Sequence, residues 1–403
     1  MPETDIERIR QLVESLHERF SVDKSAVRIV RSPYRICPIG AHIDHQLGEV
    51  TGMALEKALL LAFAPTQKAE VRVESTNFPG TIEFALDDEV PEPEGNWGDY
   101  LRGAIFALRQ EYKIQNGFLG LVDGYEHVGG LSSSAAVGVA YLLALETVNG
   151  LDVTRRQNIE LDRRIENDFI GLNNGLLDQS SILMSKKDKL MHLDCQTNEV
   201  TLHSCGIECD IWVGILYSGL ESQLSNTDYN RRVEECEEAA RILLQKAGMA
   251  SKHSPKLRRV PREIFLNYRG ILPEPLRRRA THFFSEQQRV RRGVELWEGG
   301  DLEDFGRIIT ESGRSSVKNY ECGNRYLRTA YEVLCDSEGV IGARFSGAGF
   351  RGCSIGLLKQ HPVDGLGPDI LKRYLSAHPD MEGKAEISFC RPADGASLHN
   401  IKI

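Results

Sequence analysis

Residues 129–136, Gly-Gly-Leu-Ser-Ser-Ser-Ala-Ala, form the most specific pattern in this chain. The apolar run that begins inside them, Ser134 to Leu145, predicts a buried helix. Glycines let the backbone approach a ligand closely, and the N–H groups at a helix start attract anions. Serine hydroxyls there cap the helix, donate to phosphate or hold a magnesium ion. One capping serine accounts for neither three serines nor the glycine pair, so the stretch predicts a phosphate-binding loop.

The sequence around this loop alternates strand and helix patterns, which indicates an α+β protein. Before the loop we expect strands near 27–30, 51–63, 70–74 and 81–84, and a helix over 97–112. After it we expect helices over 155–170, 231–246, 283–297 and 302–312, and strands near 212–216, 340–345 and 353–358. The basic stretch 251–279 is interpreted as a solvated helical face or loop. A length of 403 residues predicts two domains.

The composition excludes several classes of protein. There are 49 Lys and Arg against 58 Asp and Glu, a net charge of −9, so we expect no nucleic-acid partner. The longest uncharged apolar run, 135–145, is far shorter than the roughly 18 residues that span a bilayer, so we expect no membrane segment. The acidic start has no basic head or apolar core, and the nine cysteines include no C-x-x-C pair. We therefore expect a cytoplasmic protein with reduced thiols and no metal-thiolate site.

A second glycine-rich stretch, 347–352, formally fits the dinucleotide pattern G-x-G-x-x-G. That fingerprint opens a helix in a βαβ unit, whereas the residues on both sides here predict strands. We interpret it as a glycine turn that brings backbone close to a ligand. No Walker A sequence occurs in the chain, which excludes a P-loop kinase.

Two further places put polar groups in apolar surroundings. Residues 34–45 place Arg35, His42, Asp44 and His45 between apolar segments, where polar groups need partners. Asp178 follows two leucines, so its carboxylate is expected in a partly dry setting, where a cation would keep it ionised. Taken alone, Asp178 is interpreted as a helix N-cap; beside a phosphate loop, a functional role is favoured.

Three segments together resemble the galactokinase branch of the GHMP kinases, the superfamily of galactokinase, homoserine, mevalonate and phosphomevalonate kinases. They are Arg35 to His45, Gly130 to Ala136 and Ser346 to Cys353, in the family's order. The resemblance extends through Trp97 to Tyr100, the helix with Glu166, the Asp178 turn and 227–232, and so covers most of the chain. It implies an N-terminal domain, 1–209, similar to ribosomal protein S5 domain 2, and a ferredoxin-like C-terminal domain, 210–403, with the active site between them.

The resemblance also implies roles for individual residues in a kinase that uses ATP and Mg²⁺. Asp178 is the expected catalytic carboxylate, with Arg35 against it and the transferred phosphate. By the same resemblance, Ser134 and Glu166 are expected to hold magnesium, and Trp97 is expected to stack on adenine. The ATP phosphates contact Gly129, Gly130, Leu131, Ser132, Ser133 and Ser134. The sugar contacts His42, Asp44 and Tyr229, with Gly347 and Gly349 along its wall. Such a set fits phosphoryl transfer, which depends on positioning and charge stabilisation.

Two departures from galactokinases concern the substrate. Ala41 stands where galactokinases have a Glu that contacts the sugar's 6-hydroxyl. If carbon 6 carried a carboxylate, a Glu there would cost roughly 1 kcal/mol in water and about 4 kcal/mol at an effective dielectric of 20. Arg351 replaces a usual Gly and adds a cation near the same wall. Both segments resemble galacturonokinases, so we expect a D-galacturonate 1-kinase. The alternatives are a galactokinase and, in another class, a non-catalytic sugar- and ATP-binding regulator; the intact Asp178 argues against the regulator.

Overall fold

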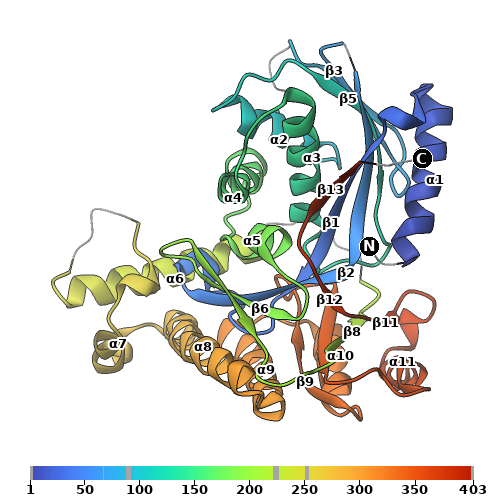
Figure 1. The fold of residues 1–403 in the computed structure, drawn as a ribbon. Helices are drawn as coiled ribbons and strands as arrows, with labels where there is room; N and C mark the ends of the chain where they lie inside the picture. The colour runs from blue at the N-terminus through green and yellow to red at the C-terminus, as the bar shows by residue number, and fades with distance from the viewer. Residues whose placement is uncertain (1–2, 67, 88–91, 221–226, 250–253, 401–403) are drawn as a thin grey trace.

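A computed structural model describes residues 3–66, 68–87, 92–220, 227–249 and 254–400 of the chain (Figure 1). The N-terminal half is built on a nine-stranded sheet. Its main path runs β13-β1-β2-β5-β3-β4; β12 and β6 also pair with β2, and β7 pairs with β6. All pairings are antiparallel except β3 with β5. The strands are β1 (Arg28–Ile36), β2 (Glu49–Thr66), β3 (Glu70–Ser75), β4 (Thr81–Ala85), β5 (Gly117–Asp123), β6 (Lys189–Asp194), β7 (Glu199–Ser204), β12 (Pro392–Ala393) and β13 (Ser397–Asn400).

Helices cover both faces of this sheet because β1 and β2 bury side chains on both sides. One face packs with α1 (Glu3–Phe20), through alternate residues such as Ile29, Leu60 and Ala62. The other face packs with α3 and α5, and Figure 1 shows α2, α3 and α4 together on that side. Their bounds are α2 (Asp99–Arg109), α3 (Ser133–Asn149), α4 (Arg155–Arg164), the π-turn η3 (Ile165–Ile170) and α5 (Leu177–Met184).

The C-terminal half has a four-stranded antiparallel sheet in the order β11-β8-β10-β9. Two helix-containing connections link its strands in a β-α-β-β-α-β sequence, which is the ferredoxin-like arrangement. The strands are β8 (Trp212–Tyr217), β9 (Val340–Phe345), β10 (Cys353–Leu358) and β11 (Glu386–Cys390). The helices are α6 (Thr227–Lys246), α7 (Arg262–Tyr268), α8 (Glu274–Gly299), α9 (Leu302–Ser315), the π-turn η6 (Ser316–Tyr320), α10 (Arg325–Cys335) and α11 (Leu366–Ala377). The expected α+β fold class is confirmed.

The expected elements are present, but several extend beyond their predicted bounds. β2 is 18 residues long and carries both β1 and β6, so its ends lie outside the apolar run at 51–63. α8 begins at Glu274, because Pro275 suits the first helical turn. The basic stretch therefore contributes α7 and the start of α8.

The two halves of the chain are tied together by the C-terminus. β12 pairs with β2, and β13 pairs with β1 over residues 397–400. Figure 1 shows the dark red β13 beside the blue β1. A division at 209/210 therefore leaves two strands of the first sheet in the second part of the sequence, and that division stays a prediction. None of the helices in the described ranges is long and apolar enough to cross a membrane.

Candidate active site

The predicted phosphate loop leads directly into α3. Gly130 has φ +90°, and Ser132, the N-cap, is left-handed with φ 57°. Ser133 and Ser134 occupy the first helical turn. A glycine turn between β9 and β10 lies against the loop: a Cβ on Gly352 would stand 2.2 Å from the Gly129 oxygen, and one on Gly347 would stand 2.9 Å from Gly130 Cα. Only glycine allows two backbones to approach this closely.

The second glycine stretch therefore packs partly on the phosphate loop. Gly347 contacts Gly130, whereas a Cβ on Gly349 would meet Cys322 Sγ at 2.8 Å. Cys322 Sγ lies 3.6 Å from His42 Nε2, so Gly349 is on the side of the His42 cluster. Arg351 is half-buried in the same turn. The predicted roles of Gly347, Gly349 and Arg351 at the sugar stay predictions.

Arg35 and Asp178 come together from positions 143 residues apart. Arg35 Nε donates to Asp178 Oδ1 at 2.8 Å, and Ser132 Oγ donates to Oδ2. The Arg35 side chain is 4% exposed and that of Asp178 is 21% exposed. Asp178 lies in the first turn of α5 and Leu176 is the N-cap, so the N-cap interpretation of Asp178 is wrong. The cation expected beside Asp178 is Arg35, and the partly exposed carboxylate can still accept a bond from a ligand.

Glu166, in the π-helix η3, lies close enough to Asp178 and Arg35 for their charges to act on it. Burial and the charge of Asp178 raise its pKa to about 7, while the Asn174 amide and the Ser134 hydroxyl favour the charged form. Its Oε1 is buried and has no hydrogen-bond partner among the described residues. A buried carboxylate oxygen without a donor, next to a serine at a helix start, suits a magnesium ion, which takes few protein ligands and completes its shell with phosphates and water. Ser134 and Glu166 thus fit the magnesium ion that the family resemblance implies.

The residues expected at the sugar form a second cluster between β1 and α6. Asp44 is buried, and burial together with Asp178 raises its pKa to about 6. Its carboxylate lies against Gly175, where a Cβ would stand 2.5 Å from Oδ2. Tyr229 on α6 is edge-to-face with His45, at 5.9 Å between ring centroids. The structure thus brings three distant segments together: Asp44 and His45, the start of α5, and Tyr229 on α6.

His42 and Ala41 occupy the buried loop after β1. His42 has φ 65° and stacks on Tyr320, with ring centroids 4.2 Å apart. Burial first, and then the charges of His282 and Arg344, hold the pKa of His42 well below its usual value. The Ala41 oxygen lies 3.0 Å from His282 Nε2. The C-terminal half therefore contributes two groups beside Ala41: His282, and the Glu286 carboxylate, which accepts from the Gly40 N–H at 2.8 Å.

Trp97 lies just before α2. Its ring stacks on Phe78, with centroids 6.4 Å apart and planes at 18°. Phe78 is 56% exposed, which is unusual for so large an apolar side chain. The pair presents a flat aromatic surface.

Three residues of the site region carried no distinctive sequence signal. Phe78 and Tyr320 are single aromatic residues, and Asp162 is one of several charges on α4. Asp162 is fully buried, and neither carboxylate oxygen has a hydrogen-bond partner in the described parts of the chain. Burial and the charge of Glu166 raise its pKa well above the usual value. The one signal in the sequence that could have identified Asp162 is its position four residues before Glu166, since residues with this spacing lie on the same face of a helix.

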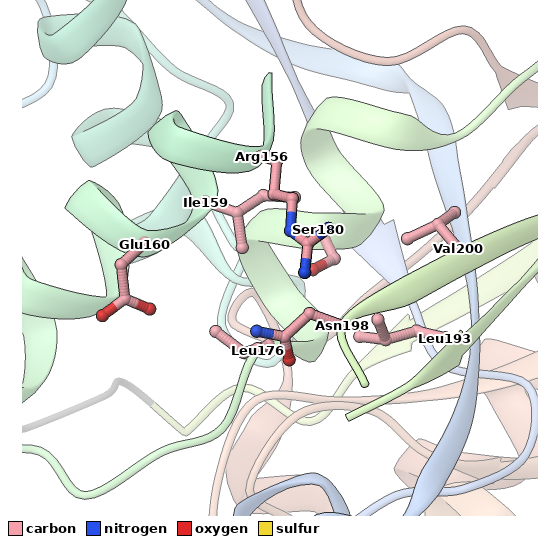
Figure 2. A pocket seen from close by; sticks show the side chains of 8 residues that line it. All are labelled: Arg156, Ile159, Glu160, Leu176, Ser180, Leu193, Asn198 and Val200. Carbon is pink, nitrogen blue, oxygen red and sulfur yellow. The ribbon is translucent and has the colours of Figure 1, made fainter. Parts of the chain in front are cut away.

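A separate small cavity lies between α4, α5 and the β6–β7 hairpin (Figure 2). It measures about 20 Å³, which is room for one water molecule. The Ser180 side chain lines it, and its buried hydroxyl has no protein partner among the described residues. This cavity is too small for a substrate.

Comparisons with known proteins show which family the chain resembles. Residues 99–186 match the GHMP kinases N terminal domain, and residues 291–366 match the GHMP kinases C terminal domain. The chain is 40% identical to a galacturonokinase of Arabidopsis thaliana, over 98% of each chain. It is 31% identical to a galactokinase of Limosilactobacillus reuteri, over 85% of this chain and 88% of the relative. A Lactococcus lactis galactokinase complexed with galactose superposes with a TM-score of 0.87 and 29% identity, over 96% of this chain and 99% of that one.

Proposed function

This chain belongs to the GHMP kinase family, and we propose that it transfers the terminal phosphoryl group of ATP to the anomeric hydroxyl of D-galacturonate. The observation that carries the transfer is the Arg35–Asp178 pair at the start of α3, where a partly exposed carboxylate meets a helix N-terminus. The observation that carries the substrate is Ala41, which leaves the sugar cluster without the acidic side chain of galactokinases. The likeness to a galacturonokinase supports the same assignment.

We propose that Asp178 accepts a hydrogen bond from the anomeric hydroxyl and orients it toward the phosphate. Arg35 donates to the carboxylate and extends cationic charge toward the developing negative charge of the transferred group. The first N–H groups of α3 have no intrahelical partner, and the helix dipole adds positive potential at the same place. Gly129 to Ser134 therefore suit the ATP phosphates.

We propose that Ser134 and Glu166 hold Mg²⁺ beside the phosphates. When bound, the ion neutralises phosphate charge during the transfer. Glu166 supplies the oxygen that is buried without a partner among the described residues. The half-buried Trp97 and the exposed Phe78 that stacks on it are proposed to contact the adenine base.

At the sugar, Asp44, His42 and Tyr229 are the proposed partners of the hydroxyl groups. Next to Ala41 lie His282 and the buried Arg344, whose charge is balanced by the buried Glu286 carboxylate that accepts from the Gly40 N–H. Ala41 itself adds no negative charge there, and this is the feature that suits a carboxylate on carbon 6. Arg351 remains our proposed direct partner for that carboxylate, from the glycine turn that reaches the Cys322 side of the site.

The test is coupled ADP release with magnesium and ATP, with galacturonate, glucuronate and galactose compared at equal concentrations. We expect a strong preference for galacturonate. Preference for galactose would make the enzyme a galactokinase with an unusual first motif, the function suggested by the structure solved with galactose. Absence of turnover with all three sugars would support a non-catalytic regulator.

A further inference from the structure

Ser132 has a backbone conformation and a side-chain partner that a phosphate ligand does not require. It is the N-cap of α3, yet it has φ 57° and ψ 51°, and its hydroxyl makes no capping hydrogen bond. A capping serine normally has extended dihedrals and accepts a bond from an N–H in the first turn. A non-glycine residue in the left-handed region persists only where its surroundings hold it there. The conformation of Ser132 therefore needs another explanation.

That explanation is the contact with Asp178. Ser132 Oγ donates to Asp178 Oδ2, while Arg35 Nε donates to Oδ1. Ser132 is buried, so little water competes for its hydroxyl. Arg35 also holds the loop itself, since its Nη1 donates to the Gly130 oxygen at 3.0 Å and its backbone N–H donates to the Leu131 oxygen at 3.1 Å. One carboxylate is thus fixed through both oxygens, from β1 and from the loop.

We infer that Ser132 is a positioning residue that fixes the orientation of the Asp178 carboxylate, and that its hydroxyl is not a phosphate ligand. This inference rests on the proposed phosphoryl transfer at Asp178. A carboxylate held through one oxygen can rotate about its Cβ–Cγ bond, whereas two donors from opposite sides stop that rotation. Asp178 then presents the remaining lone pairs in one direction, toward the acceptor hydroxyl.

In the same arrangement, the three serines have different roles. Because the Ser132 hydroxyl turns to Asp178, it leaves the N–H groups of the first turn of α3 uncapped and available to an anion. Ser133 and Ser134 follow inside the helix, and Ser134 lies beside Glu166. Ser132 thereby connects the proposed catalytic carboxylate, which its hydroxyl contacts, to the start of α3, where the phosphates are proposed to bind.

The test compares Ser132→Ala with Ser133→Ala. Alanine at 132 keeps the Cβ, and hence the backbone strain, while it removes only the hydroxyl. Ser132→Gly relieves the strain and serves as a second variant in case alanine impairs folding. We would measure kcat and KM with the sugar that the parent enzyme phosphorylates best, and the affinity for a non-hydrolysable ATP analogue by calorimetry.

For Ser132→Ala and Ser132→Gly we expect kcat to fall at least tenfold, while the affinity for the ATP analogue stays within twofold of the parent. Ser133→Ala should not combine a tenfold fall in kcat with an unchanged affinity for the ATP analogue. A fivefold or greater loss of analogue affinity in Ser132→Ala, with kcat within twofold, would overturn the inference in favour of a phosphate ligand; kcat and affinity both unchanged would overturn it as well. If the parent prefers galactose, the proposed substrate fails, but the contrast between kcat and affinity still decides the role of Ser132.

Discussion

At the scale of single residues, the proposed preference for galacturonate rests on Ala41. We expect Ala41→Glu to lower kcat/KM for galacturonate relative to galactose. Two like charges in contact cost roughly 1 kcal/mol in water and about 4 kcal/mol at an effective dielectric of 20, so the loss should lie between roughly fivefold and several hundredfold. Steady-state kinetics with both sugars measure it.

Ala41→Gln is the matched control for this variant, because glutamine has the size of glutamate without its charge. It should retain more activity on galacturonate than Ala41→Glu. An unchanged ratio of the two sugar efficiencies in Ala41→Glu would contradict the charge-repulsion argument.

Asp178 is the second residue whose role a single change tests. Asp178→Asn should lower turnover by about 10² to 10⁴-fold, the range typical for loss of a catalytic proton acceptor. Binding of a non-hydrolysable ATP analogue should persist, because the loop and the α3 N–H groups remain. Asparagine keeps an oxygen for Arg35 or Ser132, so the buried arginine is not left without a partner. Activity within a few-fold of the parent would remove Asp178 from catalysis.

At the scale of elements, α4 and its π-turn place Asp162 and Glu166 on one buried face. Because burial raises the pKa of Asp162 in the folded protein, the folded chain keeps a proton that the unfolded chain releases above about pH 4. Stability therefore falls as pH rises from there toward the folded pKa, by up to about 1.4 kcal/mol per pH unit. We expect Asp162→Asn to be more stable than the parent by a margin that grows with pH.

Denaturant unfolding from pH 4 to 8, in EDTA, measures this margin. Asp152→Asn removes an exposed carboxylate in a loop and serves as the control. A margin for Asp162→Asn that stays constant across the pH range would rule out the explanation based on the buried carboxyl.

The turn between β9 and β10 is a second element whose fit can be tested. Gly352 has φ +94°, and a Cβ there would overlap the Gly129 oxygen. Gly383 has a comparable φ of +73° but open space around it. Both alanine variants should lose about 1 kcal/mol to strain. Gly352→Ala should lose further stability and weaken ATP binding, as measured by unfolding and nucleotide titration; equal effects of the two variants would show that the contact with the loop is unimportant.

At the scale of the whole molecule, the last strands close the first sheet. A chain that ends at Arg391 lacks β12 and β13, so the edge of β1 loses its partner over Arg28 to Arg31. We expect a lower melting temperature and loss of kinase activity, because β1 also carries Arg35. A chain that ends at Asn400 keeps every described strand and is the control. Equal melting temperatures for the two chains would show that β12 and β13 do not contribute to stability.

Much of the site was predictable because its local pattern is dictated by local chemistry. A glycine pair followed by serines and an apolar run predicts an anion-binding helix start wherever it occurs, and α3 begins at Ser133 as that pattern requires. Strand and helix periodicity predicted the α+β class, which is confirmed. The short β12 and β13 carry no such pattern, since their pairing depends on partners more than 300 residues away.

By itself, then, the sequence determined the fold class and the glycine–serine loop that leads into a helix, because both follow from side-chain chemistry and spacing along the chain. The candidate site residues came from its resemblance to a family. Only the tertiary structure decided which groups meet. It placed the Ser132 hydroxyl on Asp178 and left Asp162 buried without a partner among the described residues. It also packed Gly347 and Gly352 on the phosphate loop. The physical reason is that such contacts form between distant elements, whose relative positions are set by the packing of two sheets and their helices and not by neighbours in the sequence.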